Sequence, residues 1–165
     1  MNKSKILLLS LVISFSQILT AAEQGDSIPD CTLTASSNAS SINLKQFQGK
    51  VLYVDFWASW CGPCAKSFPF LNTLDQNFKQ RDLQIVGINL DEKFADAQDF
   101  LNQYPANFMV ATDNNQQCAM GFGIKAMPSS YLVDKKGNIR HIHLGFKPGE
   151  TEQLIALVEQ LLAEQ

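Results

Sequence analysis

The sequence has few cysteines, no excess of positive charge and no long hydrophobic run, and each of these shortages excludes a class of protein. Its 165 residues include only 4 cysteines, too few for a scaffold held together by disulfides, which a chain of this length does not need in order to fold. Basic residues number 13 against 16 acidic ones, so we expect no nucleic-acid partner. Without internal repeats or low-complexity tracts, the chain fits one globular domain.

The longest apolar run lies near the N-terminus and is too short to span a membrane comfortably. It covers residues 6–19 and is interrupted by serines, whereas a spanning helix needs roughly 20 apolar residues. Two lysines precede it and small residues follow it, which is the order of a secretory signal peptide. We therefore expect residues 1–22 to be a signal peptide and residues 23–165 to be the exported domain. An uncleaved membrane anchor is the alternative.

Strand and helix patterns alternate along the rest of the chain. Apolar, β-branched or aromatic runs predict buried strands at 51–56, 83–90 and 108–111. Apolar residues spaced three and four apart predict helices at 61–80, 91–104, 116–122 and 148–163. Two short edge strands are expected within 31–44 and a hairpin within 129–145. The buried face of the second helix is expected to consist of Phe94, Ala97, Phe100 and Leu101. The alternation predicts an α/β fold with a mixed sheet.

The stretch "DFWASWCGPC", residues 55–64, carries the strongest chemical signal. A helix that begins at Cys61 directly after a buried strand places that sulfur beside unpaired backbone N–H groups and the positive end of the helix dipole, and both favour the thiolate. Cys64 lies three residues further into the helix, within reach of the first sulfur and shielded from solvent. Disulfide exchange requires this division between an exposed sulfur that attacks and a hidden one that resolves.

The neighbours of the two cysteines suit substrate binding. Trp60 offers an aromatic surface beside the reactive sulfur, and Gly62 leaves the surface flat enough for a partner's backbone. Pro63 suits the first turn of a helix, because its φ is fixed and the N–H it lacks would be unpaired there anyway.

A structural clip and half of a metal site are the alternatives for Cys61 and Cys64. A zinc site needs four ligands, usually from a second Cys or His pair. The other two cysteines are isolated in sequence, and His141 and His143 alternate on a predicted strand, so no ligand set assembles. We expect no metal and no cofactor, and we expect the two histidines to line a solvated strand face.

Several motifs together resemble a known family. The segments at 54–58 and 60–64 are similar to the thioredoxin active-site region, while "IPDCTLT" and "IKAMPSSYLVDKKGNI" resemble the exported TlpA/ResA-like branch of the thioredoxin superfamily. The resemblance covers roughly residues 28–163. It implies the thioredoxin fold, a central mixed β-sheet flanked by helices, with an N-terminal β-hairpin extension and a strand-helix insertion at about 91–111.

The resemblance also implies roles for individual residues. Cys61 corresponds to the nucleophile and Cys64 to the resolving thiol. Met127 and Pro128 correspond to the cis-proline loop beside the redox pair, where the Met127 backbone would pair with an extended substrate segment.

Asp55 interrupts an otherwise apolar strand, and a carboxylate there is costly unless it has a partner or a task. In thioredoxins the matching acid lies behind the second cysteine and moves protons, whereas TlpA-like chains commonly have Asn. The lysine that accompanies this acid in many thioredoxins is missing, because the matching strand has Val-Gly-Ile at 86–88. Proton transfer is the expected role, and a structural hydrogen-bonded Asp is the alternative.

Cys31 and Cys118 have two interpretations. They are either buried apolar thiols or a structural disulfide that ties the N-terminal extension to the helix after the inserted strand. Such a bridge would close a loop of about 90 residues and could stabilise the fold by several kcal/mol. Export to an oxidising compartment favours the bridge.

The expected function is that of an exported, periplasmic thiol-disulfide oxidoreductase whose partners are client proteins with cysteine thiols or disulfides. The Gly62-Pro63 dipeptide and Asp55 resemble reducing thioredoxins, so we expect a monomeric reductant fed by a membrane thiol electron donor. The expected clients are apocytochrome c thiols in cytochrome c maturation, copper-site assembly proteins or oxidised periplasmic cysteines. A disulfide oxidase or isomerase is one alternative. A copper-binding chaperone using Cys61, Cys64 and Met127 as soft ligands is the other.

Overall fold

The computed structural model describes residues 21–164. The signal peptide expected at residues 1–22 lies, except for its last two residues, outside the described residues. Within residues 21–164, no helix combines the length and apolar character that crossing a membrane requires.

The described residues form a seven-stranded mixed sheet with the order β2-β1-β5-β4-β3-β6-β7. Its strands are β1 (Thr32–Ala35), β2 (Ser41–Asn43), β3 (Val51–Trp57), β4 (Leu83–Asn89), β5 (Met109–Thr112), β6 (Ser129–Val133) and β7 (Ile139–Leu144). Strands β3, β4 and β5 run parallel to one another, and β6 pairs antiparallel with β3. The hairpins β1–β2 and β6–β7 complete the two ends of the sheet.

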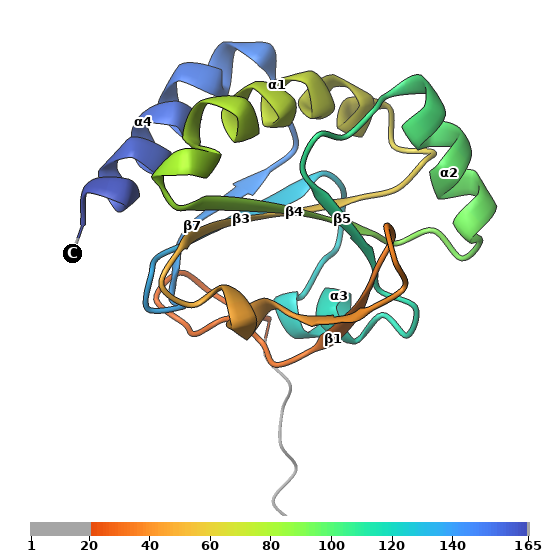
Figure 1. Ribbon diagram of the computed structural model, residues 1–165, viewed down its shortest axis with the longest axis horizontal. Coiled ribbons are helices and arrows are strands. Elements are labelled where there is room, and N and C mark those ends of the chain that lie inside the picture. The colour runs from red at the N-terminus through yellow and green to blue at the C-terminus, as the bar shows by residue number, and fades with distance from the viewer. Residues whose placement is uncertain (1–20, 165) are drawn as a thin grey trace, which may run out of the picture.

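The two sides of the sheet are covered by different numbers of helices. They are α1 (Gly62–Phe78), α2 (Phe94–Gln103), α3 (Gln117–Phe122) and α4 (Thr151–Ala163), with single 3-10 turns η1 (Leu44–Phe47), η2 (Lys79–Arg81) and η3 (Pro148–Glu150). Figure 1 shows α1, α2 and α4 on one side of the central strands β3 and β4, and α3 together with the curled end of the sheet at β1 on the other. The predicted α/β fold, with its mixed sheet, N-terminal hairpin and inserted helix and strand, is confirmed.

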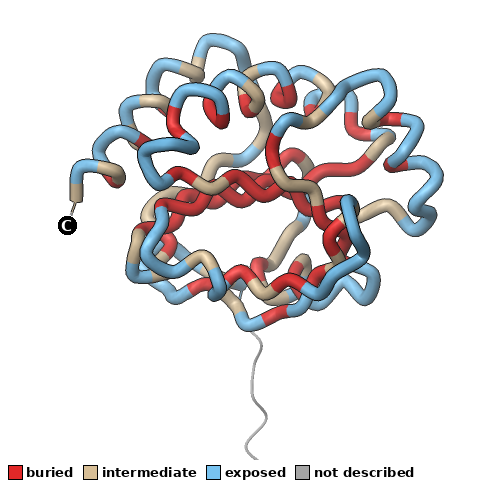
Figure 2. Tube along the Cα trace, in the orientation of Figure 1, coloured by how far each residue is buried: buried red, intermediate tan, exposed pale blue. Residues whose placement is uncertain are grey.

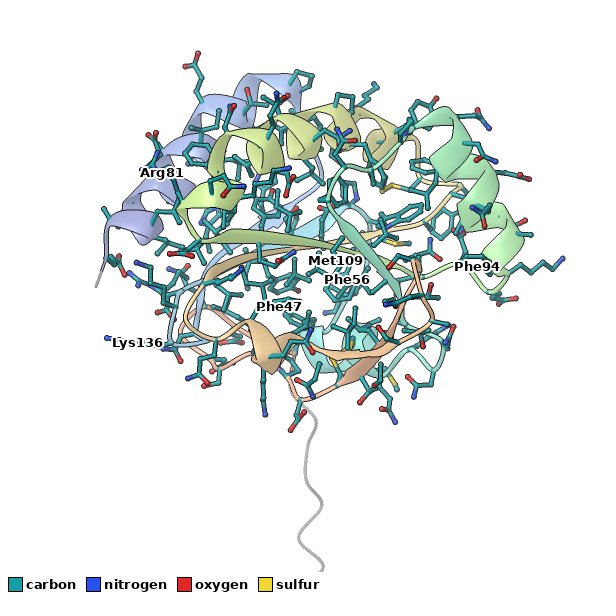
Figure 3. The ribbon with its side chains drawn as sticks, in the orientation of Figure 1. Phe47, Phe56, Arg81, Phe94, Met109 and Lys136 are labelled. Atoms are coloured by element: carbon teal, nitrogen blue, oxygen red, sulfur yellow. A yellow bond between two sulfur atoms is a disulfide. The ribbon has the colours of Figure 1, made fainter. Side chains whose placement is uncertain are left out.

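Strand β3 is buried along its whole length, because both faces of the sheet are covered. Figure 2 shows buried segments concentrated in the central strands. Val51, Tyr53 and Trp57 pack under α1 in one apolar cluster. On the other face, Phe56 points toward the α3 layer (Figure 3), and its ring centre lies 5.2 Å from that of Phe122. Continuous apolar character in β3 is therefore the consequence of a sheet covered on two sides.

Two details of the predicted fold were wrong. Strand β1 is not at an edge, because it pairs antiparallel with β5 as well as with β2; only β2 ends the sheet there. Phe94, predicted to face the core, is the first residue of α2 and is 50% exposed. Ala97 and Phe100 make the buried contacts of this helix instead.

His141 and His143 are also less exposed than predicted. Both are half-buried on β7, and their rings stack with centres 6.4 Å apart. His141 lines a hollow together with Leu157 and Leu161 of α4. The closing helix therefore covers a strand face that the alternating pattern suggested was open to water.

Candidate active site

Cys61 and Cys64 meet at the N-terminus of α1, directly after β3. Cys61 is the N-cap residue of the helix, and its Sγ accepts a hydrogen bond from the Cys64 amide at 3.2 Å. The two cysteines form a disulfide, with their Cα atoms 5.3 Å apart. Pro63 stands in the first turn. A sulfur at this position is stabilised as a thiolate by the helix dipole and by the unpaired amides of the first turn.

The exposure of Cys61 differs from the prediction, whereas the predicted burial of Cys64 is confirmed. Cys61 was expected to be exposed, but in the disulfide form it is 4% exposed and Cys64 is 0% exposed. The neighbouring Trp60 is 73% exposed. Gly62 lies at the surface, where an added Cβ would meet no atom within 4 Å. The protein's own packing therefore does not require a glycine at this position. The open space beside Gly62 leaves room for a partner's backbone.

The loop between β3 and Cys61 is held by an acid that the sequence analysis missed. Asp91 accepts hydrogen bonds from the Ser59 amide at 2.9 Å and from the Ser59 hydroxyl at 2.9 Å. Asn89, which is fully buried, donates to the same carboxylate at 2.7 Å. The sequence signal for this role is the pair of polar residues, Asn89 and Asp91, at the end of a predicted buried strand. These hydrogen bonds fix the conformation of the loop that leads from β3 to Cys61.

A hollow of about 440 Å³ opens beside the disulfide. Trp60, Cys61 and Gly62 line one wall. The lining is completed by residues of α2 and its C-cap, namely Asp96, Asp99, Phe100, Gln103 and Tyr104. The inserted helix therefore forms part of the surface that a molecule approaching the disulfide would meet.

The Met127–Pro128 peptide bond is cis, as the family resemblance implied. The Pro128 carbonyl accepts a hydrogen bond from the Gly145 amide at 2.8 Å. Met127 is half-buried and packs against the same apolar cluster as Cys61 and Cys64. Within residues 21–164, the Met127 backbone makes none of the loop and turn hydrogen bonds between main-chain groups, so its amide and carbonyl are available to a bound segment.

Asp55 is 1% exposed and lies on the face of β3 that carries Tyr53 and Trp57, under α1. Its Oδ1 accepts a hydrogen bond from the Ser130 hydroxyl at 2.6 Å, and its Oδ2 has no hydrogen-bond partner among the described residues. Burial raises the pKa of Asp55 to about 7, although the hydrogen bond from Ser130 opposes the shift. The carboxyl group can therefore gain or lose a proton near neutral pH.

The structure explains why no lysine accompanies Asp55. On β4 its neighbour in register is Gly87, where an added Cβ would lie 2.9 Å from Phe108 Cε2 and 3.3 Å from Trp57 Nε1. A side chain of any size would displace these rings. The partner of Asp55 comes instead from β6 on the other side.

Cys31 and Cys118 form a second disulfide, well away in sequence from the first. The two residues are 87 positions apart, are 4% and 0% exposed, and join the segment before β1 to α3. No free cysteine remains among the described residues. Between residues 21 and 164, no three His, Cys, Asp or Glu side chains are grouped so as to hold a metal ion.

Comparisons with known proteins agree with this architecture. The redoxin family matches residues 23–157. The chain is 36% identical over 98 residues to thiol-disulfide oxidoreductase ResA of Bacillus anthracis, covering 59% of this chain and 57% of that protein. It is 28% identical over 141 residues to ResA of Bacillus subtilis, covering 78% of each.

Among solved structures, the chain is similar to a Chlorobium tepidum protein assigned as thiol:disulfide interchange protein DsbE. The identity is 40% and the TM-score 0.82, over 87% of this chain and 100% of that one. The first curated relatives match over little more than half of their own length.

Proposed function

The chain belongs to the redoxin family, and from this premise we propose that it is an exported thiol-disulfide oxidoreductase that reduces disulfides in client proteins. The observation that carries the proposal is the disulfide between Cys61 and Cys64, located where α1 begins. Residues 1–22 would direct export to the periplasm, and residues 23–165 would form the working, monomeric domain.

In the reduced protein, the Cys61 thiolate attacks one sulfur of a client disulfide. A Cys61–client disulfide forms, the client's own S–S bond breaks, and one client thiolate leaves and takes up a proton. Cys64 then loses its proton and attacks Cys61 Sγ. The Cys61–Cys64 bond forms, the mixed disulfide breaks, and two electrons have passed from the protein to the client.

Asp55 is the group suited to take the proton of Cys64 in the second step. It lies on the face of β3 that packs under α1, the helix in which Cys64 is buried. Its pKa of about 7 lets it act as a base at neutral pH. Its Oδ2 makes no hydrogen bond to any described residue and is free to accept a proton.

Trp60, Gly62, Pro63 and Met127 are suited to hold the client. The exposed indole of Trp60 and the hollow against α2 supply a surface, while the Met127 backbone next to cis-Pro128 can pair with an extended segment. The client would be a protein with an accessible disulfide, such as an apocytochrome c or a copper-site assembly protein. A membrane thiol protein would return electrons to Cys61.

The reducing direction is supported by the Gly-Pro dipeptide and by Asp55, and a redox titration tests it. Reducing thioredoxins have potentials near -270 mV, whereas strong disulfide oxidants lie near -120 mV. We expect a value at the reducing end. A potential above about -180 mV would assign the protein to disulfide formation or isomerisation instead.

Exchange with clients is tested by trapping in the cells that export the protein. Cys64→Ala should accumulate proteins covalently held by Cys61, because the mixed disulfide can no longer be resolved. Cys61→Ala is the matched control and should hold none. If Cys64→Ala holds no protein and the purified chain retains Cu(I) against a competing chelator, the oxidoreductase proposal is overturned in favour of a copper carrier.

A further inference from the structure

Three polar side chains lie in one row across the sheet, starting from the buried acid. Asp55 on β3 stands opposite Ser130 on β6, and Ser130 stands opposite His143 on β7. Residues opposite one another on neighbouring strands point to the same face, with Cβ atoms about 4.5–5.5 Å apart. The three side chains therefore share the face of the sheet that α1 and α4 cover.

The row runs from the interior to the surface. Ser130, 5% exposed, donates its hydroxyl hydrogen to Asp55 Oδ1 at 2.6 Å. At the other end, His143 Nε2 lies 3.3 Å from Glu150 Oε2, with the two side chains 16% and 33% exposed. Glu150 also contacts the exposed Lys147 at 3.7 Å. Exposure thus rises from Asp55 to Glu150.

We propose that Ser130 and His143 are positioning residues that carry the proton of Asp55 between the buried site and Glu150 at the surface. The inference rests on the proposed function, in which Asp55 receives a proton from Cys64 in every cycle. A base that is 1% exposed must release that proton before the next cycle, and it needs polar groups along the way.

The other neighbours of Asp55 do not supply this route. On the β4 side the paired residue is Gly87, which has no side chain. Tyr53, on the same face of β3, keeps its proton because burial and the charge of Asp55 raise the pKa of its phenol. The buried polar residues of helix α1 are Ser67 and Asp75, besides Cys64 itself. The Ser67 hydroxyl donates to the Cys64 carbonyl at 3.0 Å, and Asp75 pairs with Lys79 at the far end of that helix. The buried residues of α4 are the apolar Leu154, Val158 and Leu161.

The proton count balances along the row. When Cys64 attacks Cys61, its proton passes to Asp55, which becomes neutral. A hydroxyl both accepts and donates hydrogen bonds, so Ser130 can accept the proton of Asp55 and pass its own to the imidazole of His143. The imidazole gives up its proton to Glu150 or to water, and Asp55 returns to the carboxylate. No electrons move in this relay, because the disulfide exchange accounts for both.

The resolving step can be followed alone with a coloured leaving group. Cys61 of the reduced full chain is loaded with 5-thio-2-nitrobenzoate, and the attack of Cys64 releases that thiolate as an absorbance change. In the wild type we expect the release rate to rise with pH about a midpoint near 7, following the ionisation of Asp55.

Ser130→Ala removes the hydrogen bond that favours the carboxylate, so the midpoint should rise by about one pH unit. Ser130→Thr keeps a hydroxyl and should restore the wild-type midpoint. If thermal unfolding shows that Ser130→Ala does not fold, Ser130→Val removes the hydroxyl and matches Ser130→Thr in size and shape. A midpoint that is the same with and without the hydroxyl would overturn the role of Ser130.

His143→Ala should leave the single release of nitrobenzoate unchanged. It should lower by about tenfold the steady-state rate at which the protein, kept reduced by excess dithiol, reduces a client disulfide, because Asp55 then keeps the proton that it took from Cys64. Added imidazole should restore part of the rate. His141→Ala is the matched control, a histidine on the same strand face but opposite Leu132, and its rate should neither fall nor respond to imidazole. Equal behaviour of the two histidine variants would overturn the role of His143. A wild-type protein that releases no nitrobenzoate and exchanges with no client disulfide would overturn the proposed function itself.

Discussion

Replacing Asp55 by asparagine should make the folded protein more stable at neutral and alkaline pH. Burial raises the pKa of Asp55 from 3.8 to about 7 in the folded protein, a difference of about three pH units. Each pH unit corresponds to about 1.4 kcal/mol. Holding the ionised carboxylate in the core therefore costs about 4 kcal/mol of folding free energy once the pH exceeds 7.

The sign of this effect depends on pH. Between pH 4 and 7 the folded protein holds a proton on Asp55 that the unfolded chain has lost, so stability falls as pH rises through this window. Below pH 4 the carboxyl group is neutral in both states and costs nothing. The stability gained by Asp55→Asn should therefore be near zero at pH 4 and reach about 4 kcal/mol at pH 8. The Ser130 hydroxyl can still donate to the asparagine carbonyl oxygen.

Urea unfolding of the disulfide form at a series of pH values measures the difference directly. With a slope of about 2 kcal/mol per molar urea, the midpoint of the variant should exceed that of the wild type by about 2 M at pH 8. The two curves should converge as the pH approaches 4, which serves as the internal control. The same difference in stability at pH 4 and pH 8, or a variant less stable than the wild type at pH 8, would refute the assignment of Asp55 as a buried acid with a raised pKa.

Three further predictions concern the second disulfide, the packing around Gly87 and the client surface. Replacing Cys31 and Cys118 together by serine should cost about 4 kcal/mol in urea unfolding, because their bond closes a loop across 87 positions. Disulfide exchange should survive in that variant; its loss would show that the second bridge takes part in the chemistry. Gly87→Ala should cost about 1–3 kcal/mol in thermal unfolding, since its Cβ would lie 2.9 Å from a Phe108 ring carbon, and a neutral result would mean that the ring moves freely. Trp60→Ala should leave stability within about 0.5 kcal/mol but raise the KM for a protein disulfide, because the indole is 73% exposed; an unchanged KM would remove it from the client surface.

The parts of the fold that the sequence predicted are those set by local pattern. Strands β3 and β4 are continuous apolar runs because both their faces are covered, and a run of that length is visible without knowing what covers it. The start of α1 is equally local, since the cap at Cys61 and the proline after it lie within three residues. The hairpin β6–β7 follows from its turn residues.

The parts that the sequence did not predict depend on contacts between distant segments. The pairing of β1 with β5 joins Thr34 to Thr112, and no nearby residue encodes that choice. The exposure of Phe94 and the partial burial of His143 depend on which helix covers which face. The support of Ser59 by Asp91 depends on β3 and β4 ending side by side. Such facts follow from packing, which a periodic pattern does not specify.

The reactivity of Cys61 is the property on which disulfide exchange depends, and its alkylation rate across pH measures it most directly. In the reduced protein, Cys61 alkylation should reach half of its maximal rate well below pH 8.5, the value typical of an ordinary thiol, because the sulfur caps α1. Cys64→Ala leaves Cys61 as the thiol that reacts and should give the same midpoint. A midpoint at or above pH 8.5 would contradict activation of Cys61 by the helix.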